Sequence, residues 1–224
     1  MTPGGQRAGR IVGLIHTAPD NAVRFDALVR ERLPDAEQLH VVDAWLLDEA
    51  VRHRVDGRHD ERIAAHVEHL TERGAAAILV TCSSIGEVGD RVALDARVPV
   101  LRVDRPMARR AAALAKAGGG RITALATLAS TLEPTTRLLT DEAGSGIEVA
   151  GRIVEGAIQA RHVGDTATFD RLIGEAVDAA LADGAVIVLA QATMANALGG
   201  DDRGGCVLSS PASAADALAE AADA

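Results

Sequence analysis

Short apolar runs alternate with amphipathic segments along most of the chain. Runs rich in Ile, Leu and Val, each followed by small or polar residues, predict strands that are buried on both faces. The expected strands cover residues 11–15, 39–42, 75–80, 99–103, 122–126, 147–150, 186–189 and 207–208. Segments with apolar residues three or four positions apart predict helices at residues 20–32, 60–73, 104–118 and 167–183, with others opening near residues 84, 130 and 211. This alternation predicts parallel sheets flanked by helices.

The second half of the chain repeats the first. Residues 185–195 align without a gap with residues 76–86, at an offset of 109 residues that pairs Gln191 with Cys82. A repeat of this length predicts two copies of one α/β unit. We therefore expect an α/β fold of two similar lobes, each a parallel sheet flanked by helices. A pseudo-two-fold duplication should relate the lobes and leave the active site between them.

The order of the expected elements predicts where each lobe begins and ends. Residues 1–104 make the first lobe and residues 105–205 the second, while residues 206–224 return to the first lobe through a C-terminal helix. With 224 residues and 48% hydrophobic content, the chain is able to bury one core or two half-cores. Residues 43–58 form a charged connection, a flap or part of a contact surface, and carry the only tryptophan, Trp45.

Composition argues against several classes of function. The net charge of −9, with two Phe, one Trp and no Tyr, argues against nucleic-acid binding and against an anionic membrane surface. Lys116 is the only lysine, which argues against Schiff-base chemistry. We expect no cofactor. The polar residues 1–10 lack the apolar centre of a signal peptide, and no apolar run reaches membrane-spanning length. A cytoplasmic protein is expected.

Cys82 follows the most apolar run of the chain, residues 75–80. Ser84 and Glu87 have the spacing of a capping box, which predicts a helix N-terminus directly after the cysteine. Unpaired N–H groups and the helix dipole lower a thiol pKa there, and with Ser83 and Ser84 they are suited to bind a carboxylate. The alternative is an inert cysteine that fills space at a strand end.

The second cysteine, Cys206, has a different setting. It aligns with Pro99 at the start of a predicted strand, where we expect packing and no chemistry. Two cysteines do not indicate a disulfide framework.

Ligands of parallel α/β sheets bind at the carboxyl ends of the strands. That rule gathers two sets of residues around one cleft. The candidate catalytic residues are Cys82, His16 and Gln191, and the candidate substrate-binding residues are Thr17, Ser83, Ser84, Thr127, Ser130, Thr131, Ala192 and Thr193.

His16 ends the first strand and is matched by Thr127 in the repeat. Its near-neutral unperturbed pKa suits a second acid/base, or a partner that activates Cys82 as a nucleophile. A histidine that only donates a hydrogen bond is the alternative.

His66 and His69 lie three residues apart on a predicted helix. No third ligand completes a metal site, so we expect a solvated helix face and no metal.

The strand followed by Thr81-Cys82-Ser83-Ser84, the segment 126–131 and the segment 189–194 resemble the aspartate/glutamate/hydantoin racemase superfamily, which includes arylmalonate decarboxylase and maleate isomerases. The resemblance covers nearly the whole chain at the level of the repeat. It implies a two-lobed fold with the active site between the lobes. It also implies that Cys82 is the first-lobe catalytic cysteine and that Thr127, Ser130 or Thr131, and Thr193 bind a carboxylate.

The chain departs from this family pattern at Gln191, where racemases of the family usually carry their second cysteine. Two-base racemisation needs a proton acceptor on one face and a proton donor on the other. Glutamine has no titratable group and does neither.

The sequence therefore predicts a cofactor-independent isomerase of the racemase superfamily that uses a Cys82 thiolate at a carbon next to a carboxylate or carbonyl. A single-cysteine decarboxylase or another lyase is the enzymatic alternative. A ligand-binding or regulatory protein that has lost one half of the machinery is the alternative from another class. The expected partner is a small carboxylate-bearing substrate, with no nucleic acid and no membrane. The Ala-rich C-terminal helix is either a docking element or the surface of a homo-oligomer.

Overall fold

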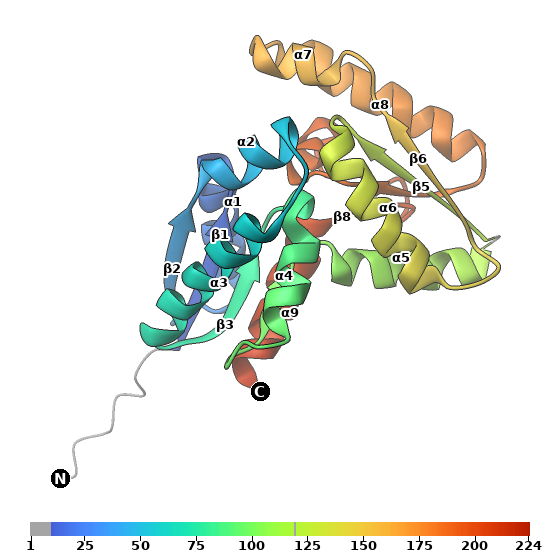
Figure 1. Ribbon diagram of the computed structural model, residues 1–224. Helices are drawn as coiled ribbons and strands as arrows, with labels where there is room; N and C mark the ends of the chain where they lie inside the picture. The colour runs from blue at the N-terminus through green and yellow to red at the C-terminus, as the bar shows by residue number, and fades with distance from the viewer. Residues whose placement is uncertain (1–9, 119) are drawn as a thin grey trace.

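The computed structural model describes residues 10–118 and 120–224 (Figure 1). Residues 1–9, which carried most of the expectation about a signal peptide, and Gly119 lie outside the described residues. Among the described helices, none has both the length and the apolar character that a membrane crossing requires.

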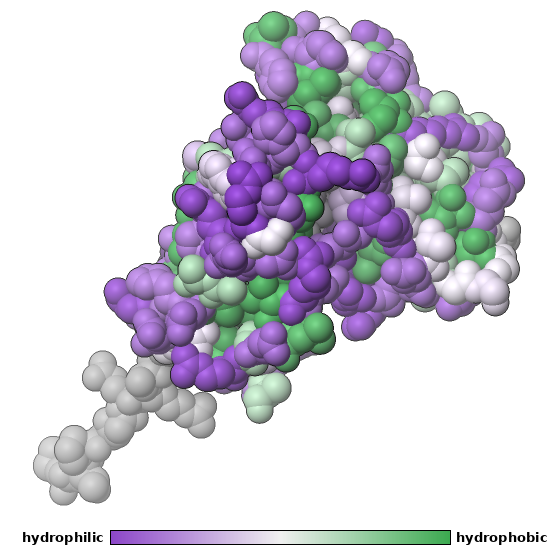
Figure 2. All heavy atoms as spheres, in the orientation of Figure 1, coloured by the Kyte–Doolittle hydropathy of each residue, from purple (hydrophilic) through white to green (hydrophobic). Residues whose placement is uncertain are grey.

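The first lobe is built on a parallel four-stranded sheet with the order β2-β1-β3-β4. Its strands are β1 (Ile11–His16), β2 (Glu37–Val42), β3 (Ala75–Val80) and β4 (Val100–Arg102). Its helices are α1 (Pro19–Arg32), α2 (Ala44–Arg52), α3 (Gly57–Glu72) and α4 (Gly86–Ala93), and a short 3-10 helix, η1 (Ser83–Ile85), connects β3 to α4. On the face shown in Figure 2, hydrophilic side chains gather over α2 and α3, as expected of a solvated surface.

The second lobe repeats this arrangement in a parallel sheet with the order β6-β5-β7-β8. Its strands are β5 (Arg121–Ala126), β6 (Glu148–Ile153), β7 (Val186–Leu189) and β8 (Val207–Ser209). The helices α5 (Arg105–Gly118), α6 (Ala129–Ala143), α7 (Ala157–His162), α8 (Thr166–Ala182) and the 3-10 helix η2 (Ala192–Leu198) surround it. Two lobes with the same strand order confirm the expected fold class.

Each sheet is buried on both faces, as the apolar strands predicted. In the first lobe α2, α3 and α4 pack on one face, while α1 and the C-terminal helix α9 (Ser210–Asp223) pack on the other. In the second lobe α7 and α8 cover one face and α5 and α6 cover the other (Figure 1).

The C-terminal segment joins both lobes. β8 pairs with β7 in the second sheet, whereas Ala214 and Leu218 of α9 lie in the same core as Phe25 of α1. The chain therefore returns to the first lobe at the start of α9, a few residues after the expected boundary at residue 206.

Two short helices occupy segments that the sequence indicated as connections. α2 lies within the charged segment 43–58, and α7 lies between β6 and α8. Asp43 precedes α2 without capping it, because its carboxylate contacts Arg62 and accepts a hydrogen bond from His66 at 2.7 Å. The start of α2 therefore depends on contacts with α3, and a capping side chain that would mark it in the sequence is not used.

The capping box predicted at Ser84 and Glu87 is wrong in detail, and two other helices also begin without a cap. Ala18, Ile85 and Leu128 hold the N-cap positions of α1, α4 and α6, and none of these helices has a side-chain cap. Helix starts therefore precede or follow the expected residues by one or two positions, which leaves the hydroxyls of Thr17 and Ser84 available for contacts in the cleft.

A buried ion pair marks the place where the chain leaves the first lobe. Arg102 at the end of β4 donates to Asp104 at 2.7 and 3.0 Å and to Asp90 of α4 at 2.7 Å. Arg105 extends the contacts to Asp90 and to Glu142 of α6 in the second lobe. Both Arg102 and Asp104 are almost fully buried, so each charge depends on the other.

We expect Arg102→Met to lower the free energy of unfolding by about 3–5 kcal/mol, because it leaves the buried Asp104 carboxylate without a partner. Urea unfolding measures the change. The exposed pair Arg171–Glu175 is the control, and Arg171→Met should cost no more than about 0.5 kcal/mol. A similar small cost for both variants would show that the buried pair does not stabilise the fold.

Candidate functional site

A pocket of about 270 Å³ lies where the carboxyl ends of the two sheets face each other. Strand ends β3 and β7 contribute its two opposite sides, through Cys82 and Gln191. Nine of the eleven sequence-predicted site residues line it: Thr17, Cys82, Ser83, Ser84, Thr127, Thr131, Gln191, Ala192 and Thr193. His16 and Ser130 are not among the lining residues.

The pocket also has walls that sequence reasoning missed. Leu47 of α2 and Ile158, Arg161 and His162 of α7 line it, and both helices lie in segments expected to be loops. Asp20 of α1 lies 3.7 Å from Arg161, so an ion pair joins the two lobes at the pocket. No local pattern marks these residues, because they reach the pocket only through the packing of the lobes.

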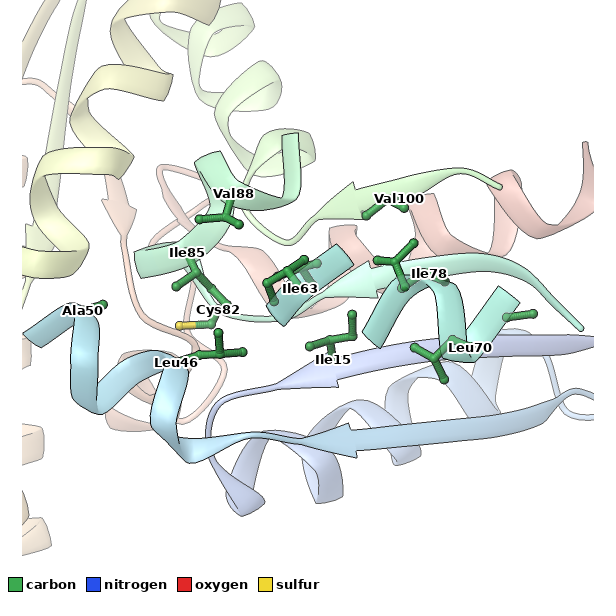
Figure 3. Close-up of a cluster of buried hydrophobic side chains, with 13 residues drawn as sticks. Ile15, Leu46, Ala50, Ile63, Leu70, Ile78, Cys82, Ile85, Val88 and Val100 are labelled. Carbon is green, nitrogen blue, oxygen red and sulfur yellow. The ribbon is translucent and has the colours of Figure 1, made fainter. Parts of the chain in front are cut away.

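Cys82 is held by several hydrogen-bond donors and is nevertheless buried. It is the N-cap of η1, 9% exposed, and lies in the first-lobe core beside Leu46 and Ile85 (Figure 3). Burial raises the pKa of the thiol, while hydrogen bonds from Thr17 and from the backbone and hydroxyl of Ser84 lower it. Burial dominates, so the expected low pKa is wrong and the resting group is a thiol.

Ser84 connects the cysteine to the second lobe. Its hydroxyl is 2.9 Å from the Thr131 hydroxyl of α6. A hydroxyl carries one proton, so a Ser84 that donates to Cys82 accepts from Thr131. Arg137 of α6 also donates to Glu87 of α4 at 2.7 Å, so a second, exposed contact joins the two lobes.

Gln191 is fixed on the opposite side of the pocket. Its Oε1 accepts from the Thr127 backbone N–H at 2.7 Å and from the Thr127 hydroxyl at 2.9 Å. The amide orientation follows from the chemistry, because a backbone N–H only donates and must therefore face the oxygen.

The strand register shows which residues are equivalent in the two lobes. Gly13 pairs with Ile78 in the first sheet, and Thr123 pairs with Ile187 in the second. Counting forward from Gly13 and Thr123, Thr17 is the equivalent of Thr127. The sequence alignment had matched His16 with Thr127 and was wrong by one residue. In both lobes, the threonine directly after the first strand thus contacts the second residue after the third strand.

This shift explains why His16 is outside the pocket. Adjacent strand residues point to opposite faces of the sheet, and the His16 ring is fully buried against Phe25 and His40. Its Nδ1 is 2.8 Å from the Thr81 hydroxyl and its Nε2 is 2.9 Å from His40 Nδ1. Burial and the nearby His40 lower the pKa of His16 to about 3. The predicted acid/base role is therefore corrected to that of a neutral core histidine beside Thr81.

Ser130 is the other residue that does not reach the pocket. It lies in the first turn of α6, and its hydroxyl is buried without a hydrogen-bond partner among the described residues. Thr131, the next residue, takes the place at the pocket that the resemblance had left open between the two.

A larger groove of about 520 Å³ lies on the surface between α3 and the end of α4. Asp60, Glu61, Arg91 and Arg97 line it, without a cysteine or a strand end. We therefore place the chemistry in the smaller pocket. Within residues 10–118 and 120–224, no cluster of three metal-ligating side chains is present.

Comparison with known proteins agrees with the two-lobed fold. The sequence profile of the family described as Asp/Glu/Hydantoin racemase matches residues 22–218. The chain belongs to this family. No curated protein matches it in sequence.

Several solved structures of the racemase type share the fold. Aspartate racemase from Picrophilus torridus is 19% identical, with a TM-score of 0.68 over 96% of this chain and 95% of that one. Allantoin racemase from Klebsiella pneumoniae is 16% identical, with a TM-score of 0.67 over 94% and 86%. Unliganded arylmalonate decarboxylase is 17% identical, with a TM-score of 0.60 over 95% and 92%. At these identities the likeness shows the fold alone.

The two cysteines should react with iodoacetamide in the reverse of the order that the sequence indicated. Cys206 is exposed, whereas Cys82 is buried and its pKa is raised. In the native protein near pH 8, Cys206 should be alkylated first, and Cys82 should react readily only after unfolding in urea. Peptide mass spectrometry measures both rates. Faster native labelling of Cys82 would contradict the closed site.

His16 should make folding sensitive to acid. Its folded pKa of about 3 is lower than the ordinary value of 6.5, so its contribution to stability is complete above pH 6.5 and is lost as the pH falls toward 3. Between pH 7.5 and 4.5 the native protein should lose about 2–3 kcal/mol more than His16→Gln, which does not titrate. Urea unfolding at the two pH values measures this difference. His53→Gln, at an exposed position, is the control and should follow the native protein.

Proposed function

We propose that this protein is a cofactor-independent isomerase that moves a proton at a carbon next to a carboxylate or carbonyl of a small acid. Cys82 is its proton carrier, because Gln191 at the equivalent strand end has no titratable group. The observation that carries the proposal is the pairing of one thiol with one carboxamide at equivalent strand ends of a single pocket. Membership of the racemase family supports the class of reaction.

The pocket contains the groups that such a reaction needs. A Cys82 thiolate accepts the proton, and the electrons of the C–H bond move into an enolate whose negative charge develops on oxygen. Ser83 and Thr193 line the same space, and their hydroxyls are suited to bind the acid group, whereas the Thr17 hydroxyl donates to Cys82. The Cys82 thiol then returns the proton to a neighbouring carbon on the same face, which gives the isomer, whereas return to the original carbon regenerates the substrate.

The raised pKa of Cys82 favours a second candidate, the decarboxylase. A resting thiol is a proton donor. When a carboxylate leaves as carbon dioxide, the electrons of the C–C bond remain on the carbon. Cys82 then protonates that carbon and recovers its own proton from water. This reaction needs a single thiol and no base on the opposite face.

A screen in deuterated water tests both candidates. Amino acids, hydantoins and malonates are incubated with the native protein, and deuterium at the α-carbon and released carbon dioxide are measured. Cys82→Ala should abolish activity, whereas Cys206→Ala at the exposed site should retain it. The isomerase should gain activity as rising pH forms the thiolate, and the decarboxylase should lose activity as the thiol disappears.

Activity that persists in Cys82→Ala would overturn both mechanisms. Binding of acids by the native protein without exchange or decarboxylation would favour the ligand-binding alternative instead.

A further inference from the structure

Gln191 occupies the donors that were expected to bind substrate. The backbone N–H and the hydroxyl of Thr127 both point at its Oε1, at 2.7 and 2.9 Å. A substrate carboxylate is therefore excluded from these two donors unless it displaces the side chain. The carboxamide oxygen is satisfied, and the carboxamide is held in one orientation.

The carboxamide nitrogen of Gln191, Nε2, carries two N–H donors. Nε2 has no hydrogen-bond partner within residues 10–118 and 120–224, and the half-buried side chain lines the pocket opposite Cys82. A donor that is partly removed from water and fixed in orientation is suited to an anionic or carbonyl oxygen. Asp20, the only acidic side chain among the described residues that line the pocket, is 3.7 Å from Arg161.

In the first lobe, Thr17 occupies the position equivalent to Thr127 and contacts a different kind of side chain. Thr17 is a hydrogen-bond partner of Cys82, as Thr127 is of Gln191. In one lobe the threonine hydroxyl stabilises a group that exchanges a proton. In the other it orients a group that keeps its protons.

We propose that the Gln191 carboxamide is a fixed hydrogen-bond donor that binds an oxygen of the substrate's acid group, in place of a second proton carrier. This inference rests on the proposed function and deepens it. As the α-proton or carbon dioxide leaves, negative charge grows on that oxygen, and a preorganised donor stabilises it. The substrate must therefore present a carboxylate or carbonyl oxygen toward Gln191 while its reacting carbon faces Cys82.

The test combines ligand binding with turnover. Malonate is the probe, and its uncharged diamide is the control ligand. In native protein the Nε2 proton resonances, assigned by their loss in Gln191→Met, should shift on addition of malonate. Gln191→Met should weaken malonate binding at least tenfold and lower kcat by about 10²-fold, with a smaller effect on KM.

Gln191→Glu is the matched variant of the same shape. Its carboxylate retains the acceptor toward Thr127 and loses the donor, so malonate binding should be weakest at neutral pH. Binding should recover as the pH falls and the new carboxyl group is protonated. Circular dichroism confirms that each variant is folded.

Absence of a malonate-dependent shift at Nε2 would overturn the inference. A shift mainly at the Thr127 N–H, with tighter malonate binding by Gln191→Met, would also overturn it, because the ligand would then displace the side chain. Binding effects at Gln191 without turnover would leave the donor role standing and reject the proposed reaction. Turnover that depends on Cys82 and ignores Gln191 would do the reverse.

Discussion

The register between the first and third strand of each sheet determines which side chains meet in the cleft. Because neighbouring strand residues point to opposite faces, this register directs Thr17 toward Cys82 and buries the side chain before it. Close packing holds the register: a Cβ added at Gly13 would lie 2.9 Å from Leu70 Cδ1 of α3. A slip by one residue would exchange a pocket hydroxyl for a core imidazole.

The state of the thiol depends on how completely the lobes enclose it. Hydrogen bonds from Thr17 and Ser84 favour the thiolate, but the cover from α2 and the first-lobe core favours the thiol and dominates. The hydrogen-bond donors to Cys82 are fixed by the strand ends. By contrast, α2, which covers the thiol, is a short helix that side-chain contacts attach to α3, such as the hydrogen bond from Arg58 to Glu49 at 2.6 Å. Any movement of α2 that admits water would therefore lower the thiol pKa without rearranging the donors.

Much of this arrangement was predictable, because burial leaves a strong pattern in sequence. The apolar runs located the strands, and the repeat correctly placed Cys82 and Gln191 at equivalent strand ends. The His16 assignment failed because the sequence matched His16 with Thr127, an offset of 111 residues, whereas the hydrogen-bonded register makes Gly13 equivalent to Thr123, an offset of 110 residues. The walls from α2 and α7 had no local signal, since Leu47 and Arg161 reach the pocket through tertiary packing.

A carboxamide at the strand end equivalent to that of Cys82 limits what the two-lobed fold is able to do. A pocket with proton carriers on both faces treats the two faces of an enolate alike, and so interconverts enantiomers. Here the carboxamide of Gln191 keeps its protons, and its oxygen is committed to Thr127. Under the proposed function, Cys82 delivers the proton, while Gln191 contributes orientation and charge stabilisation. The asymmetry of a reaction on this scaffold thus follows from one residue, because the two sheets that support the pocket remain alike.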